Sequence, residues 1–134
     1  MLEIEMMNDG YNYLLEKFDC KMAKQEVPFL SRCIDVVLVN QDDKVISIEF
    51  KISKWRHAIE QAVNHKLGAD KAYICLPKRK ISDKLSQALE KNEIGLLVFD
   101  AEREEKISVA IPAPENGHNV PIFKKLLLSN LNKI

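Results

Sequence analysis

The stretch Arg32–Lys51, RCIDVVLVNQDDKVISIEFK, decides the fold of this chain. Residues 32–40 are rich in β-branched side chains, which is typical of a strand. Residues 44–51 alternate apolar and polar side chains, and this period of two predicts a second strand. The polar residues 41–43 between them predict a turn. A connection this short predicts that the two strands form an antiparallel hairpin.

The position of the turn also predicts the register of the hairpin. If the chain reverses at Asp42, paired residues have numbers that sum to 84, and Asp35 lies opposite Glu49. Directly opposed residues have Cβ atoms roughly 5 Å apart. Lys51 follows Glu49 by two residues and therefore shares its strand face. The sequence thus predicts a cluster of two carboxylates and one ammonium, which a slip of one residue would break.

Asp35 is the most informative member of this cluster. Apolar side chains are expected to line both faces of its strand: Ile34, Val36 and Leu38 on one, and Val37 and Val39 on the face of Asp35. A carboxylate in such a strand is costly to bury unless a cation or hydrogen-bond donors satisfy it. Lys51 alone could be that partner, and Glu49 with Lys51 could be a surface charge pair. A divalent metal would instead serve both carboxylates at once.

The residue types favour Mg²⁺ as that metal, with Mn²⁺ as a substitute. Hard cations prefer carboxylate, carbonyl and water oxygens. The backbone carbonyl of Phe50 lies between Glu49 and Lys51 and could supply a third protein oxygen. A bound metal lowers the pKa of its water and offsets charge on a phosphate during hydrolysis, and Lys51 could orient that water.

Hydrophobic periodicity and capping residues predict the other elements. They are a helix over 2–18, a short strand over 21–27, a helix from an N-cap at Ser53 to Gly68, a strand over 71–76, a helix capped by Ser82, strands over 94–99 and 106–111, and a last helix from Pro121. This order predicts a mixed α/β fold around one central sheet. At 134 residues we expect a single domain over 1–134, with a core over about 2–100 and a C-terminal extension over 101–134.

The arrangement of Asp35, thirteen intervening residues and then Glu49-Phe50-Lys51 resembles the PD-(D/E)xK nuclease superfamily, which includes restriction endonucleases and Holliday-junction resolvases. The αβββαβ order predicted for residues 2–76 is similar to the core of that superfamily. The resemblance covers roughly the first hundred residues and implies a restriction-endonuclease-like fold. It also implies a metal-dependent nuclease acting on DNA, with Asp35 and Glu49 as metal ligands and Lys51 as the catalytic lysine.

The resemblance extends to two helices. The family often adds a glutamate from the first helix as a further metal ligand; Glu3 and Glu5 both lie near that position, and Glu5 is favoured. Some members carry a catalytic glutamine in a Q-x-x-x-Y segment of the next helix. Gln61 fits this position, but His65 stands where the tyrosine would be. The proline that often precedes the aspartate is replaced by Ile34.

The charge distribution is compatible with a nucleic-acid partner although the net charge is zero. Residues 51–80 carry 8 Lys/Arg and 2 Asp/Glu, directly after the carboxylate cluster. Such a patch can attract phosphates, and Lys54, Arg56 and Gln61 are the candidate contacts. The same charges could equally form a solvated helix face and a basic turn over 78–80.

Three functions remain open on sequence alone. The first is the metal-dependent nuclease, and the second is a catalytically inactive nucleic-acid- or partner-binding module that retains the fold. The third is a purely structural protein with a surface Glu49–Lys51 pair. A homodimer is expected because duplex cleavage often needs two sites. No apolar run of membrane-spanning length and no signal peptide occurs, and the three cysteines match no zinc motif, so we expect a cytoplasmic protein without a membrane partner.

Overall fold

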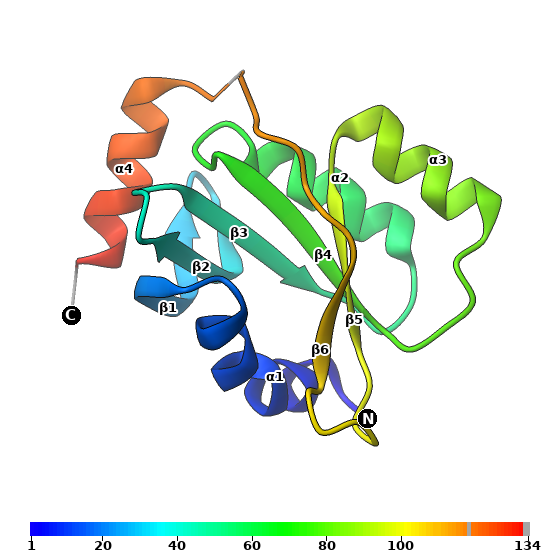
Figure 1. Ribbon diagram of the computed structural model, residues 1–134. Coiled ribbons are helices and arrows are strands. Elements are labelled where there is room, and N and C mark those ends of the chain that lie inside the picture. Colours follow the sequence, from blue (N-terminus) through cyan, green and yellow to red (C-terminus); the bar gives the residue numbers. More distant parts are fainter. Residues whose placement is uncertain (118, 133–134) are drawn as a thin grey trace.

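A six-stranded mixed sheet with helices on both faces forms the described part of the chain, residues 1–117 and 119–132, in the computed structural model (Figure 1). In chain order the elements are α1 (Glu3–Lys17), β1 (Cys20–Phe29), β2 (Arg32–Asn40), β3 (Val45–Phe50), α2 (Trp55–His65), β4 (Lys71–Pro77), α3 (Asp83–Asn92), β5 (Gly95–Phe99), β6 (Ile107–Ile111) and α4 (Pro121–Leu131). Each strand lies beside its neighbour in sequence, in the order β1-β2-β3-β4-β5-β6.

The sheet is parallel only in its centre. β3 and β4 are parallel, as are β4 and β5, while the other three pairs are antiparallel. Parallel neighbours need a crossover connection, and α2 and α3 supply the two that are required. This arrangement brings the carboxyl ends of β3, β4 and β5 to one edge of the sheet.

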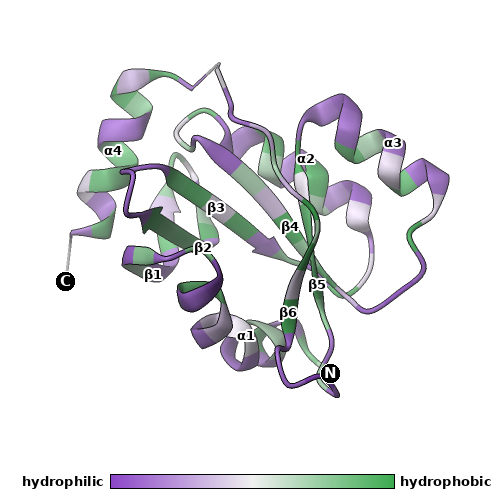
Figure 2. Ribbon diagram, in the orientation of Figure 1, coloured by the Kyte–Doolittle hydropathy of each residue, from purple (hydrophilic) through white to green (hydrophobic). Residues whose placement is uncertain are grey.

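Apolar residues of the central strands fill the core on both sides of the sheet (Figure 2). On one side, α1 contributes Met6, Met7 and Leu14 to a cluster with β3 and β4. On the other side, α2 and α3 pack over β4 and β5, and α4 packs over β1 and β2. The central strands are therefore buried on two faces, which explains their nearly continuous apolar sequences.

The β2–β3 hairpin has the predicted register. Val36 pairs with Ile48 and Val39 with Val45, so paired residue numbers sum to 84 as expected. The Asn40 side chain fixes the turn, because its Oδ1 accepts the N–H groups of residues 42 and 44 at 2.9 and 3.0 Å. A local turn that uses its own side-chain acceptor explains why the sequence was sufficient to predict the pairing.

The expected side-chain alternation along β2 is wrong at one residue. Ile34 packs in the same cluster as Val37 and Val39 beside α4, instead of sharing a face with Val36. The irregularity coincides with Glu26 of β1, which has a left-handed φ of 53° between the pairs that β1 forms with residues 34 and 36. A non-glycine residue in this conformation bends the strand locally. β1 itself is longer than the strand predicted over 21–27.

The start of α2 also differs from the prediction. Ser53 is not the N-cap; Lys54 holds that position with a left-handed φ of 56° and no side-chain cap hydrogen bond. Ser82, by contrast, caps α3 as predicted, because its Oγ accepts the Leu85 N–H at 3.1 Å. Pro121 opens α4 as predicted.

The last helix lies over β1 with part of its apolar surface exposed. Leu127 and Leu131 are buried, whereas Ile122 and Leu126 face solvent. None of the helices in residues 1–117 and 119–132 is long and apolar enough to cross a membrane.

Asp70 ties this C-terminal part to the sheet. Its Oδ2 accepts the Val45 N–H at 2.8 Å and lies 2.9 Å from Lys124 Nζ, while its Oδ1 accepts from Asn119 Nδ2 at 2.9 Å. Its backbone oxygen accepts the Asn116 N–H at 2.7 Å. One buried residue thus joins the start of β3, the loop before α4 and α4 itself.

We predict that Asp70→Ala destabilises the protein by about 2–4 kcal/mol, because it leaves buried donors and the Lys124 ammonium without their acceptor. Urea unfolding followed by circular dichroism measures the change. Asp42→Ala, at the exposed turn, is the control and should change the free energy of unfolding by less than about 0.5 kcal/mol. Equal stabilities of the two variants would contradict the role of Asp70.

Candidate active site

The centre of the candidate site is a pair of carboxylates between β2 and β3. The hairpin ladder ends at Val36 and Ile48, and Asp35 and Glu49 occupy the next positions. The Asp35 N–H donates to Glu49 Oε1 at 3.0 Å, and the Phe50 N–H donates to Asp35 Oδ2 at 2.8 Å. Each carboxylate therefore takes a backbone donor from the opposite strand, which positions both side chains through the main chain.

Burial makes this pair electrostatically unfavourable when both groups are charged. Glu49 is only 4% exposed and Asp35 is half-buried. Burial, followed by the charge of Asp35, raises the pKa of Glu49 to about 8. Burial also raises the pKa of Asp35, although the Phe50 N–H and Lys51 oppose this shift. The pair therefore holds a proton where two isolated carboxyls would have lost theirs.

Lys51 lies directly after β3 and is mostly buried, with a side-chain exposure of 22%. Its positive charge opposes the rise in the pKa of Asp35 and of Glu49, but does not cancel it. Its Nζ is 4.0 Å from Glu3 Oε1, an oxygen that also accepts the Ile52 N–H at 3.2 Å. The structure thus brings together Asp35, Glu49, Lys51 and a glutamate of α1.

The glutamate that reaches this cluster is Glu3, whereas Glu5, the candidate favoured from the sequence, bonds the end of its own helix. Glu5 Oε1 accepts the Leu2 N–H at 3.4 Å and so closes the end of its own helix. Glu3 reaches the segment after β3 and raises the pKa of Asp35 through its negative charge. The first turn of α1 offers both acids, and only the packing of α1 on the sheet selects between them.

The oxygens of this site fit a hard divalent cation. Asp35 and Glu49 supply carboxylates, and the Phe50 carbonyl leaves the strand on the side where its N–H meets Asp35. Mg²⁺ typically uses one or two carboxylates and keeps several waters. Within residues 1–117 and 119–132, no three His, Cys, Asp or Glu side chains gather in a way that could hold a metal. A divalent cation bound by Asp35 and Glu49 would offset the repulsion within the pair.

Gln61, the predicted catalytic glutamine, lies on α2. It lines a small hollow between α2 and the β1–β2 turn, together with Phe29, Arg32 and His65. In the described residues no hydrogen bond joins Gln61 to the carboxylates, and its buried Oε1 has no partner. His65 is buried as well, and burial lowers its pKa to about 4, so its imidazole is neutral at pH 7. The structure therefore does not connect the predicted catalytic glutamine to the site.

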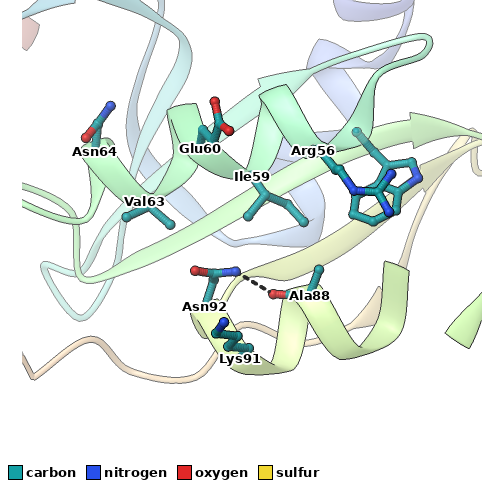
Figure 3. Close-up of a pocket in the computed structure, with 9 residues that line it drawn as sticks. Arg56, Ile59, Glu60, Val63, Asn64, Ala88, Lys91 and Asn92 are labelled. Carbon is teal, nitrogen blue, oxygen red and sulfur yellow. Dashed lines mark hydrogen bonds between the residues drawn. The ribbon is translucent and has the colours of Figure 1, made fainter. Parts of the chain in front are cut away.

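Lys54 and Arg56 are exposed at the start of α2, next to the segment that carries Lys51. The Arg56 guanidinium lies over the Trp55 ring, 4.3 Å from its centre. Trp55 and Arg56 line a groove of about 530 Å³ between α2 and α3, with Arg56 at one end and Asn64 at the other (Figure 3). Trp55 is mostly buried.

Ser47 is a polar residue of this region that the sequence did not single out. It is fully buried on β3, two residues before Glu49, and its Oγ has no hydrogen-bond partner in the part of the chain that the structure describes. All six residues of β3 are buried, so the polar positions of this strand face the α2 side rather than solvent. The alternation of Ser47 and Glu49 with apolar residues is typical of a strand with one solvent-exposed face, so the sequence did not indicate that Ser47 is buried.

Comparison with solved structures identifies the fold class of the chain. No protein-family model and no curated protein sequence matches this chain. A protein of unknown function from Silicibacter pomeroyi has a similar structure, with a TM-score of 0.69, 20% identity, and coverage of 98% of this chain and 84% of that one. A repair endonuclease from Pyrococcus abyssi is similar with a TM-score of 0.54 and 20% identity over 72% of this chain and 46% of that one, so this chain spans less than half of the endonuclease. The chain thus has a restriction-endonuclease-like fold: a mixed sheet with an αβββαβ core.

The carboxylate pair predicts how stability depends on pH. Glu49 has an ordinary pKa of 4.5 when unfolded and one of about 8 when folded, so folding takes up a proton between these values. The contribution of Glu49 to the free energy of unfolding is complete below about pH 4.5 and is lost as pH rises through 8. The pKa of Asp35 is also raised, so Asp35 changes the stability in the same direction. We therefore predict that the free energy of unfolding of the metal-free protein falls between about pH 5 and about pH 8.

Urea unfolding across this pH range in EDTA measures the effect. Glu49→Gln removes the titrating group and should flatten the curve, whereas Glu60→Gln, an exposed position on α2, should leave it unchanged. If the free energy of unfolding depended on pH in the same way for wild type and Glu49→Gln, Glu49 would not be the group that takes up the proton.

Proposed function

We propose that this protein is a divalent-metal-dependent nuclease of the PD-(D/E)xK type that hydrolyses phosphodiester bonds in DNA. The observation that carries the proposal is the buried pair of Asp35 and Glu49 with Lys51 beside it, on a restriction-endonuclease-like fold. The similarity to a repair endonuclease supports the fold on which this chemistry is proposed. Two copies would be needed to cut both strands at one place, since each chain supplies one such site.

Three groups of the site are placed to bind a metal. Asp35, Glu49 and the Phe50 carbonyl would hold Mg²⁺, with Mn²⁺ as a substitute. When bound, the metal lowers the pKa of water and offsets charge on the reacting phosphate. Glu49 must release its proton before it can act as a ligand, so metal binding competes with protonation near pH 8. Backbone hydrogen bonds hold both carboxylates in place before the metal arrives.

Lys51 acts on the water and the phosphate. Its side chain is mostly buried, and its charge acts on both carboxylates. In this position it orients the attacking water and offsets the charge that develops on the phosphate oxygens. Glu3 holds the ammonium and the backbone of residue 52 at once, and so fixes the segment that carries Lys51.

We predict that purified protein nicks supercoiled plasmid with Mg²⁺ or Mn²⁺ and that Glu49→Gln and Lys51→Ala each lower the rate by about a thousandfold, since each removes a group that stabilises charge in the transition state. Gel electrophoresis over a time course measures the rates. Glu60→Gln is a matched carboxylate control on the outer face of α2 and should nick like wild type.

Calorimetric titration with Mn²⁺ separates this function from the catalytically inactive module. The nuclease should bind Mn²⁺, and Asp35→Asn should lose that binding while remaining folded. Nicking traces that are equal for wild type, Glu49→Gln and Lys51→Ala would sink the catalytic proposal. DNA binding without Mn²⁺ binding would then favour the inactive module.

We further predict that Glu3→Gln lowers the nicking rate by about tenfold or more, because it frees the segment around Lys51 and removes a carboxylate from the site. Glu5→Gln is the matched control on the same helical turn and should change the rate by less than about twofold. The two variants are compared in the plasmid assay at equal folded fraction. A larger loss of rate in Glu5→Gln than in Glu3→Gln would contradict this prediction and assign the role to Glu5.

A further inference from the structure

Positively charged residues lie on the β3–α2 and β4–α3 connections, which leave the sheet at the same end of its strands. β3 and β4 are parallel, with Phe50 beside Cys75, and the Lys51 N–H donates to the Cys75 oxygen at 3.0 Å. The chain segments that follow β3 and β4 therefore emerge next to each other (Figure 1). The first carries Lys51 and Lys54, and the second carries the exposed residues 78–80, Lys-Arg-Lys.

Two of the three cations on the second connection have no acidic partner. Lys78 lies 3.7 Å from Asp100, and its N–H donates to the Phe99 oxygen. Arg79 and Lys80 form no ion pair with any of residues 1–117 and 119–132; the Arg79 Nε donates only to the Lys80 backbone oxygen at 3.3 Å. Arg79 and Lys80 therefore present their charges to solvent.

The surface around these cations is concave. Arg79 and Lys80 line a depression of about 500 Å³ together with Ile81, Ser82 and Asp83. Asp83 is the one acidic side chain among these lining residues, so cations outnumber it. A depression with excess positive charge concentrates anions more strongly than a convex surface with the same charges.

The length of the β4–α3 connection suits a polynucleotide. Lys80 follows Cys75, the β4 residue paired with Phe50, by five residues, which span at most about 17 Å of extended chain. Nucleotides advance about 3.4 Å along the axis of a duplex strand, so this reach corresponds to about five nucleotides. Arg79 and Lys80 are therefore placed to hold phosphates a few nucleotides from a bond that lies at Asp35 and Glu49.

Acidic side chains follow Asp100, the partner of Lys78, in the β5–β6 turn. This turn exposes Glu102, Glu104 and Glu105, of which Glu105 lies 3.5 Å from Lys17. A polyanion is repelled by the acids of this turn and attracted by Arg79 and Lys80.

We propose that Arg79 and Lys80 form a contact surface for the DNA backbone on the β4–α3 connection, which extends the one formed by Lys54 and Arg56 after β3. It holds the phosphates that flank the cleaved bond on the β4 side. The inference rests on the proposed nuclease function for its substrate, but the contact itself requires no cleavage.

The test measures binding in protein that cannot cleave. Glu49→Gln protein in EDTA is titrated into a fluorescent DNA duplex of about 20 base pairs, and anisotropy is followed from about 50 to about 200 mM KCl. Adding Arg79→Ala and Lys80→Ala is expected to weaken binding roughly tenfold and to reduce the slope of log K against log salt by about 2. Lys78→Ala should have a smaller effect than either neighbour, because Asp100 already offsets its charge.

The matched control removes two cations from elsewhere on the molecule. Lys71→Ala with Lys125→Ala changes the net charge equally, at the start of β4 and on the exposed side of α4. Affinity and salt slope of this control should stay within about twofold of the parent. Equal losses in the two double variants would overturn the proposal, as would absence of binding by the parent protein.

Two further arms separate the possible failures. An RNA duplex of the same sequence is titrated in parallel, because phosphates are common to both polymers; an effect of Arg79→Ala and Lys80→Ala on RNA alone would overturn the assignment to DNA. Nicking is measured independently with wild-type protein. Failure to nick, with the binding losses as expected, would overturn the nuclease and leave the contact surface standing.

Discussion

The arrangement of the site depends on two carboxylates that share a narrow space between β2 and β3. Both would carry a charge at neutral pH in water, yet here burial raises the pKa of each. Two backbone N–H groups and one ammonium stabilise the charged forms, and they do not fully offset the cost of burial. The unfavourable energy that remains is what the proposed divalent cation would relieve. The same feature therefore costs stability in the free protein when both carboxylates are charged.

The position of this pair follows from the topology of the sheet. The antiparallel hairpin brings Asp35 beside Glu49, and the parallel pairing with β4 then buries β3 on its other edge. Parallel pairing requires the crossover through α2, which packs on β3 and β4. Because α2 begins only a few residues after Lys51, the same crossover also places the cations at the start of α2 close in the chain to Lys51.

Sequence was sufficient where local interactions decide the structure. The β2–β3 register followed from a turn that Asn40 closes with its own side chain, and the cost of burying Asp35 followed from the apolar residues around it. Sequence failed where distant elements decide. Glu3 and Glu5 are equivalent until α1 packs on the sheet, and the bend at Ile34 depends on the backbone of Glu26 in another strand. The placement of Gln61 depends on where the β1–β2 turn meets α2.

The neutral net charge of the chain has a physical consequence for how it meets a polyanion. A protein with a large positive charge binds nucleic acid through many orientations, and that binding carries no information about where the reactive groups lie. Here Lys51 and Lys54 lie on the connection after β3 and the cations of residues 78–80 on the connection after β4, while the other cations are spread over the chain. With DNA as the proposed substrate, such a local group of cations would favour the orientations in which the nucleic-acid backbone passes the carboxylate pair.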